Sequence, residues 1–460
     1  MESSQRTVLR AGRREWVGLA VLALPTLLLA LDFSVLFLVL PRLSADLHPS
    51  AVQLLWITDA YGFLIAGFLI TMGTLGDRIG RRRLLLLGAV LFAGASVFAA
   101  YSTGPLMLVA ARALMGVAAA TLMPSTLALI STLFADPAQR ARAISVWVAC
   151  FMGGAALGPI VGGALLTTFW WGSVFLLGVP VMVLLLVTAP FVLPEHRSQK
   201  VGRIDAISVL LSLGAVLPTV YGIKELAGTG GLLPAFTALA VGGAAGSAFV
   251  RRQRRLSEPL VDVRLFRSRA FSGGVVGMTL NSAIMGGTAL LINLHLQTAV
   301  GLSPSEAALW LAPGALAIVV SSLAAPLLVR RLQPADVIAG GMAVAAVGYL
   351  LLSRADAAGP ILAANVLIGL GAGPITALVT DLIVGSVPAT EAGSAAAISE
   401  TGGDLGIALG VAVLGSLGTT IYTGAAGLTA AGFLAAALAV MIGVLAITTL
   451  RSSAPNRPTA

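Results

Sequence analysis

The chain has 460 residues, of which 58% are hydrophobic and only 10% are charged, and its formal charge is +9. Soluble globular proteins carry about 25% charged residues, so this composition excludes a soluble globular protein. The positive charge falls in short clusters between apolar runs, a pattern that excludes a basic nucleic-acid-binding domain. Because Cys150 is the single cysteine, an internal disulfide is excluded as well.

Apolar runs of about twenty residues recur along the whole chain, and each is long enough to cross about 30 Å of hydrocarbon as a helix. The first run follows a basic flank and no small-residue cleavage site closes it, so we expect an uncleaved first helix. The sequence therefore predicts an all-α polytopic membrane protein. Its fourteen predicted spans lie near residues 16–40, 52–72, 84–102, 105–134, 143–166, 170–191, 206–223, 232–250, 271–294, 307–329, 335–353, 360–387, 393–422 and 430–450.

The basic residues predict the orientation of these spans. If the N-terminus is cytoplasmic, 24 of the 28 lysines and arginines fall in cytoplasmic segments and Arg112 lies within a span. Only Arg42, Lys224 and Arg354 are then expected outside. This split satisfies the positive-inside rule and predicts that both termini are cytoplasmic. Arginine outnumbers lysine 26 to 2, which, with abundant alanine and glycine, is typical of a GC-rich bacterial genome, so we expect the inner or plasma membrane of a bacterium.

A glycine- and arginine-rich motif lies between the second and third predicted spans, at residues 73–83. Its glycines permit a tight turn and close helix approach, and its aspartate can accept from a helix N-terminus or from an arginine. An ordinary positive-inside segment explains the arginines but not the spacing of the other residues. The motif resembles the cytoplasmic loop signature of the major facilitator superfamily. The residues that carry the resemblance are Gly73, Gly76, Asp77, Arg78, Gly80 and Arg81.

Two further motifs agree with that resemblance. Arg112 and Gly116 resemble the fourth-helix motif of the superfamily. A glycine-rich stretch in the fifth span resembles the motif associated with antiporters that export, and this favours export over import. Small-residue helix packing is the alternative explanation, and it is partly sufficient. The residues of this stretch are Gly154, Gly158, Pro159, Gly162 and Gly163.

The count of fourteen spans, rather than twelve, together with further motifs, makes the chain resemble one group within the superfamily, the drug:H+ antiporter-2 multidrug exporters. The likeness runs over essentially the whole chain and includes Asp32-Phe-Ser, Trp56-Ile-Thr-Asp59 and the stretch at residues 395–406. It implies two six-helix bundles, residues 1–191 and 257–460, with two inserted helices at residues 192–256. Two departures are a short segment of about eight residues before the last span, and a tenth span without the acidic residue that some relatives carry. Selectivity tied to that carboxylate, such as for divalent cations, is not expected here.

Charged residues inside the predicted spans are candidate functional groups, because an unpaired charge in a bilayer costs several kcal/mol. Arg112 is the single basic residue among them, so the cavity is expected to favour cations. At about 1.5 Å per residue, Arg112 and two of the acids are expected roughly 10–12 Å below the outer surface, where they could meet. Two others share a face of the thirteenth span. The two acids expected near Arg112 are Asp32 and Asp59. The two on the thirteenth span are Glu400 and Asp404, and the fifth acid is Asp381.

Competition for one carboxylate is the predicted coupling mechanism. Burial raises a carboxyl pKa, so an intramembrane Asp can bind either a proton or a drug cation. We expect Asp32 to couple proton entry to export with Arg112 tuning it, and Glu400 and Asp404 to handle substrate charge or a second proton. The alternatives are a permanent structural Asp32–Arg112 pair, a capping role or a partly hydrated helix start for Asp59, and simple contact of Asp381 with cytoplasmic water.

The sequence thus predicts a proton-coupled antiporter that exports lipophilic cations such as dyes, quaternary ammonium compounds and fluoroquinolones. No nucleotide-binding, catalytic or metal-binding motif occurs, so we expect a transporter driven by the proton motive force, with no enzymatic activity, cofactor or metal. The family resemblance implies a monomer. An exporter of one endogenous metabolite, antibiotic or lipid is the first alternative, and a non-transporting receptor or scaffold is the second. The arginines of residues 251–269 are expected to orient the chain as solvated groups, and contact with anionic lipid headgroups is the alternative.

Overall fold

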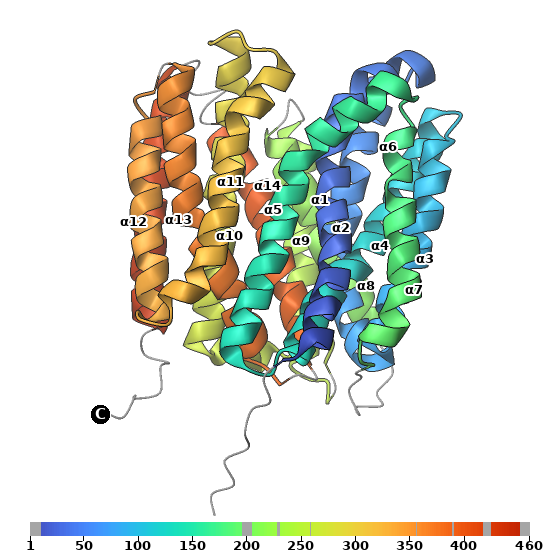
Figure 1. Cartoon of the computed structure of the whole chain (residues 1–460), viewed down its shortest axis with the longest axis vertical. Coiled ribbons are helices and arrows are strands. Elements are labelled where there is room, and N and C mark those ends of the chain that lie inside the picture. The colour runs from blue at the N-terminus through green and yellow to red at the C-terminus, as the bar shows by residue number, and fades with distance from the viewer. Residues whose placement is uncertain are drawn as a thin grey trace, which may run out of the picture.

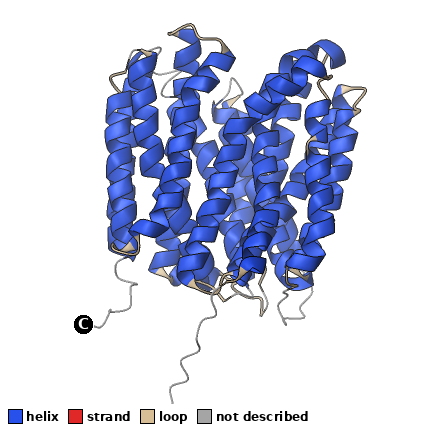
Figure 2. Ribbon diagram, in the orientation of Figure 1, coloured by secondary structure: helices blue, strands red, loops and turns tan. Residues whose placement is uncertain are grey.

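The computed structural model describes residues 11–195, 205–227, 231–257, 259–355, 357–388, 391–416 and 425–450. Within these ranges helices are the only regular secondary structure, and they run nearly parallel to one another (Figure 2). The helices of the first half are α1 (Arg13–Leu47), α2 (Ala51–Ile79), α3 (Arg81–Ala100), α4 (Pro105–Leu133), α5 (Pro137–Thr168), α6 (Ser173–Leu176) and α7 (Gly178–Val192). They are followed by α8 (Ala206–Ala227), α9 (Leu232–Gln253), the short 3-10 helix η1 (Val263–Arg267), α10 (Arg269–Thr298), α11 (Pro304–Leu328), α12 (Pro334–Leu352), α13 (Ala358–Gly385), α14 (Ala392–Ser416) and α15 (Ala425–Leu450).

The predicted count of fourteen spans is confirmed for the described residues, which contain fourteen helical segments long and apolar enough to cross a membrane. The sixth span is made of α6 and α7, which are separated only at Leu177. Because fourteen spans alternate in direction, α1 begins and α15 ends on the same side of the molecule, the lower side in Figure 1. The charge distribution assigns that side to the cytoplasm. The predicted short connection before the last span falls partly on residues 417–424, outside the described residues.

Two predicted boundaries are wrong because a helix does not stop where its apolar stretch ends. The second span was expected to end at residue 72 and the motif at residues 73–83 to form a loop. Instead α2 continues to Ile79 and α3 begins at Arg81, so most of the motif is helical and the turn is Gly80 alone. Gly80 has a φ of 111°, which residues with a side chain rarely adopt, and this explains the glycine there.

The helices form two hydrophobic cores, one built mainly from α1–α7 and the other mainly from α10–α15. In Figure 1 the blue-to-green helices and the yellow-to-red helices accordingly occupy opposite sides of the molecule. The inserted helices α8 and α9 pack extensively on each other, and α8 also contacts α2 and α14. The inserted pair therefore lies along the junction of the two halves, where α2 and α14 meet.

The glycines of the predicted export motif bring α5 against α1. A methyl group added at Gly154 would meet the backbone of Leu27, and one added at Gly158 would meet Leu31 and Ser34. Gly162 packs against Val35, whereas Gly163 has only an ordinary contact with the Leu38 side chain. Small-residue packing, the alternative considered for this motif, therefore accounts for Gly154, Gly158 and Gly162. Pro159 also lies within α5.

This packing predicts different outcomes for two adjacent glycines. Gly154→Ala is expected to lower the free energy of unfolding by about 1–3 kcal/mol, because the new methyl group has no room beside Leu27. Gly153→Ala is the matched control, since a methyl group there meets nothing within 4 Å and alanine favours the helix by up to about 1 kcal/mol. Denaturant unfolding of the purified variants measures both changes. Equal effects at the two positions would contradict this account of the motif.

Candidate functional site: buried charges between the helix bundles

The predicted pair of Asp32 and Arg112 forms inside the N-terminal bundle. Arg112 of α4 donates from Nη1 to Oδ2 of Asp32 on α1 at 2.6 Å, and the two side chains are 0% and 4% exposed. The Tyr61 ring of α2 lies 4.4 Å from the Arg112 guanidinium carbon, and the Phe175 ring of α6 lies 5.9 Å away. The guanidinium is therefore stabilised by one carboxylate and by the faces of two aromatic rings.

Arg112 nevertheless keeps unused hydrogen-bonding capacity. Its Nε and Nη2 atoms are buried and have no hydrogen-bond partner among the described residues. Tyr61, whose ring covers the guanidinium, donates its hydroxyl proton to the carbonyl oxygen of Leu29 at 3.4 Å. Asp32 is the only anionic group that holds Arg112 within the described structure. Buried donors normally find partners, so the two unpaired atoms are unusual. Protonation of Asp32 would leave the arginine without that partner.

Asp59 was expected at a depth where it could meet this pair, but in the structure it pairs with Lys224. Its Oδ1 atom is 2.8 Å from Nζ of Lys224 on α8, and the two side chains are 31% and 41% exposed. The helix geometry explains the difference, because Tyr61 faces Arg112 and a residue two positions away points roughly 200° around the helix. Lys224, expected in an outer segment, lies instead within the last turn of α8.

Glu400 and Asp404 share one face of α14, as predicted from their spacing. Both side chains are partly accessible, and neither makes an ion pair or hydrogen bond with another described residue. Asp404 lies within electrostatic reach of the Tyr61 hydroxyl and of Glu400. The C-terminal half therefore carries two neighbouring acids without basic partners, and Asp404 is the one within electrostatic reach of the aromatic residue that covers Arg112.

Asp381 was a candidate for substrate or proton binding, with simple contact with cytoplasmic water as the alternative, and in the structure it belongs to an ion pair that joins the two halves. Nε of Arg140, near the start of α5, donates to Oδ1 of Asp381 on α13 at 2.7 Å. The side chains are only 18% and 13% exposed. Sequence spacing placed Asp381 near the cytoplasmic end correctly but gave no information about its partner across the junction.

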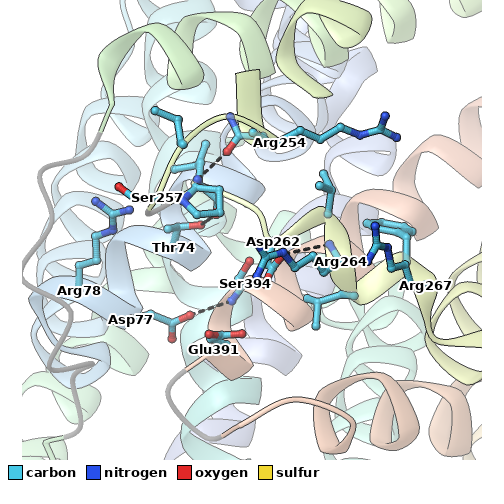
Figure 3. Close-up of a pocket in the computed structure, with 17 residues that line it drawn as sticks. Thr74, Asp77, Arg78, Arg254, Ser257, Asp262, Arg264, Arg267, Glu391 and Ser394 are labelled. Carbon is cyan, nitrogen blue, oxygen red and sulfur yellow. Dashed lines mark hydrogen bonds between the residues drawn. The ribbon is translucent and has the colours of Figure 1, made fainter. Parts of the chain in front are cut away.

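The motif of α2 forms a second connection between the halves on the cytoplasmic side. Asp77 accepts hydrogen bonds from the backbone N–H groups of Gly393 and Ser394 at 3.2 and 3.0 Å, at the N-terminus of α14. Figure 3 shows the bond with Ser394. The Oδ1 atom of Asp77 also accepts from Nε of the buried Arg81 at 2.9 Å. Asp77 thus contacts both kinds of partner that the sequence predicted, an arginine and a helix N-terminus. The absence of a side chain at Gly73 lets α2 approach the backbone of Gly393.

Arg81 is itself fixed to α4, where it donates to the carbonyl oxygen of Ala128 and to Oγ1 of Thr132, both at 3.0 Å. Arg78, by contrast, lines a pocket of about 720 Å³ between α2, α14 and the segment that follows α9. Figure 3 shows Arg78 and Arg264 around this pocket together with the acids Asp77, Asp262 and Glu391. The pocket is polar, of mixed charge and cytoplasmic, so it is a poor match for a lipophilic cation, and headgroup contact by residues 251–269 stays a prediction.

These contacts define the conformation. Asp77 and Arg140 both tie the N-terminal half to the C-terminal half near the cytoplasmic ends of the helices, and α5 packs along α11. Figure 1 shows α5 leaning away from α11 toward the upper, outer side. The two halves are therefore joined near the cytoplasmic ends of the helices, the arrangement expected of an outward-facing transporter.

Sequence reasoning missed three residues of this arrangement, namely Tyr61, Lys224 and Arg140. Tyr61 belongs to the motif that contains Asp59, and a search for aromatic residues two positions from each acid would have found it. Lys224 is the only lysine near the end of a span, and Arg140 is a charged residue near the start of another. Among the described residues, no three His, Cys, Asp or Glu side chains are placed to hold a metal ion.

The comparisons with known proteins agree with this fold. The sequence matches the family description "Major Facilitator Superfamily" over residues 22–411 and again over residues 274–460. The chain belongs to the Major Facilitator Superfamily. It is a multi-pass membrane protein of that transporter family. The human organic anion transporter MFSD10 has the same fold, with a TM-score of 0.67 over 94% of this chain and 99% of that chain, although only 16% of the residues are identical.

Several curated members of the superfamily are similar over most of this chain. The multidrug efflux pump LfrA of Mycolicibacterium smegmatis is 44% identical over 416 residues, covering 90% of this chain and 82% of LfrA. The methyl viologen resistance protein SmvA of Salmonella typhimurium is 37% identical over 88% of this chain and 82% of its own length. The tetracenomycin C resistance and export protein of Streptomyces glaucescens is 32% identical over 88% of this chain and 76% of its own length. The relatives thus include multidrug efflux and antibiotic export proteins.

Proposed function

We propose that this member of the Major Facilitator Superfamily is a proton-coupled multidrug exporter of lipophilic cations in the bacterial plasma membrane. The observation that carries the proposal is the arrangement of charge between the halves. Two acids without basic partners, Glu400 and Asp404, lie on α14, while the buried Asp32–Arg112 pair lies in the other bundle. Such acids favour a cation that has left water, because a positive charge in a membrane interior needs a partner. The names of LfrA and SmvA support efflux of drugs and toxic compounds.

In the proposed cycle, a proton from outside neutralises Asp32 in the outward-facing state and releases Arg112 from its carboxylate. Glu400 and Asp404 bind the drug cation when they are ionised and give it up when they are protonated, because a neutral acid no longer offsets the cation's loss of hydration. Opening of the Asp77 and Arg140 contacts then exposes the site to the cytoplasm. The proton motive force is the proposed energy source, and the substrate crosses without chemical change, as a monomer among lipids and with no cofactor.

A dedicated exporter is the second candidate, and particular relatives favour it. The relatives include a tetracenomycin C export protein, a probable actinorhodin transporter and a cephamycin export protein, each at 32% identity. A panel of cationic, zwitterionic and neutral drugs separates the two candidates, since a dedicated exporter moves one class only. A non-transporting receptor or scaffold is the third candidate, and it predicts no accumulation of any compound against a gradient.

The test is ethidium accumulation in acid-inside proteoliposomes that contain the purified protein. Wild-type protein is expected to accumulate ethidium until a protonophore collapses the gradient. The Glu400→Gln/Asp404→Asn variant is expected to accumulate it at least about tenfold more slowly, because the groups that offset the cation's desolvation are gone. Asp46→Asn, which removes an exposed acid at the outer end of α1, is the control and should behave as wild type. Protonophore-insensitive accumulation by the wild type would refute proton coupling.

A further inference from the structure

The inserted helix α8 packs antiparallel along α2 in a fixed register. Near the outer end Lys224 lies opposite Asp59, and in the middle Leu217 fits against Gly67, where any side chain would collide with it. Farther toward the cytoplasm the hydroxyl oxygens of Thr71 and Ser212 are 3.5 Å apart. Residue numbers rise along α2 as they fall along α8, so one continuous helix contact positions the lysine at the carboxylate.

Asp59 lies on an aromatic strip of α2. Trp56 precedes it by three residues and Phe63 follows it by four, so all three share a helix face. The two rings contact each other edge to face, with their centroids 5.8 Å apart. A carboxylate next to aromatic rings is a suitable site for an organic cation with delocalised charge, which gains both an ion pair and a cation–π contact.

In the present structure the Asp59 carboxylate forms an ion pair with Lys224. Because 41% of the Lys224 side chain and 31% of that of Asp59 are exposed, other protein groups do not enclose the pair, and a competing cation can approach it. Partly exposed ion pairs contribute little to stability, so a purely structural role explains the lysine poorly. An ammonium group is also strongly hydrated and returns to water at low cost. The acid Glu225, next to Lys224 in the chain, is the other charged group on this turn of α8.

We propose that Lys224 is a tethered competitor for the exported cation at an outer site formed by Asp59, Trp56 and Phe63. The ammonium group neutralises Asp59 when no substrate is present, and it lowers the affinity of this site for organic cations so that they leave toward the outside. The inserted helices thereby take part in substrate selection through α8. The inference takes its substrate class, lipophilic cations, from the proposed function.

The test is equilibrium binding of tetraphenylphosphonium to the purified full-length protein in lipid nanodiscs, at one pH and without a gradient. Lys224→Met is expected to tighten binding about two- to fivefold, the range that a partly exposed ion pair permits. Lys224→Arg retains the charge and should bind as wild type does. In an Asp59→Asn background, binding should be weaker and Lys224→Met should have no further effect, because the competition has disappeared.

Arg252→Gln is the matched control. It breaks a comparably exposed ion pair at the cytoplasmic end of the inserted helices, where Nε of Arg252 on α9 lies 2.5 Å from Oδ2 of Asp205, the residue before α8. The arginine holds the pKa of Asp205 well below its usual value, so this pair stays ionised as long as the pH is above that lowered pKa. The variant should leave tetraphenylphosphonium binding unchanged.

Three outcomes decide between the possibilities. If Lys224→Met binds with wild-type affinity, or if it tightens binding equally in the Asp59→Asn background, the competitor role is overturned while the proposed function stands. If Lys224→Met mainly lowers the unfolding temperature and weakens binding, the lysine is structural and the inference is again overturned. If the wild type binds none of a series of lipophilic cations, the proposed function fails and the inference fails with it.

Discussion

Asp32→Asn is expected to abolish the accumulation of ethidium driven by a pH gradient, and to leave the exchange of labelled for unlabelled ethidium across the membrane measurable. The reason is that asparagine cannot carry the proton that the proposed cycle needs, while the acids Glu400 and Asp404, the proposed drug-binding groups, remain. A loss of at least about tenfold in the gradient-driven rate is expected, which corresponds to about 1.4 kcal/mol of lost coupling. Both rates can be measured in the same proteoliposomes, with and without the imposed gradient.

A folding defect has to be separated from a loss of coupling in this experiment. Asp32→Asn leaves Arg112 buried without a carboxylate, and removing one member of a buried ion pair costs about 3–5 kcal/mol. Asp32→Asn/Arg112→Gln removes both charges, so it is expected to recover much of the stability and none of the gradient-driven accumulation. If the double variant recovered gradient-driven accumulation, the pair would be a structural element and the proton carrier would have to be another acid.

The position of each residue along a span could be predicted from the sequence, but its direction around the helix could not. Hydropathy and the rise per residue placed Asp32, Asp59 and Arg112 at similar depth, and two of the three do meet. The third does not, because the direction in which Asp59 points depends on which face of α2 packs against α4 and which against α8. That choice is made by many packing contacts, such as the fit of Leu217 against Gly67, and no single motif reports it.

Partners across the junction were also beyond the reach of sequence reasoning. The chemistry of Asp77 indicated a helix N-terminus or an arginine, yet α14 begins more than 300 residues later in the chain, and several helix N-termini lie on the cytoplasmic side. Asp381 and Arg140 are likewise 241 residues apart. Such contacts exist in one conformation of a transporter only, so composition and spacing carry no direct sign of them. The family resemblance supplied the fold, whereas the closed cytoplasmic side came from the structure.

Asp77→Ala is expected to shift the protein away from the outward-facing state. The carboxylate accepts two backbone N–H groups at the N-terminus of α14 and pairs with Arg81, whose side chain is 1% exposed. Hydrogen bonds to a charged group contribute about 1.5–3 kcal/mol each, so losing this group is expected to change the ratio of outward- to inward-facing molecules by about tenfold or more. Hydrogen–deuterium exchange of the peptide that contains Gly393 and Ser394 measures the opening directly, because their amides lose the acceptor that protects them.

Arg83→Ala separates this effect from a general loss of charge in the same motif. Arg83 is 64% exposed and its nearest acid, Glu195, is 3.8 Å away, so the substitution should leave both the exchange of the α14 amides and ethidium transport close to wild type. Asp77→Asn is the intermediate case, since its amide oxygen can still accept from one backbone N–H while the charge that holds Arg81 is lost. The expected order of amide protection is therefore wild type and Arg83→Ala first, Asp77→Asn next and Asp77→Ala last. Faster exchange in Arg83→Ala than in Asp77→Ala would mean that the basic charge of the motif, and not the Asp77 contact with α14, keeps the cytoplasmic side closed.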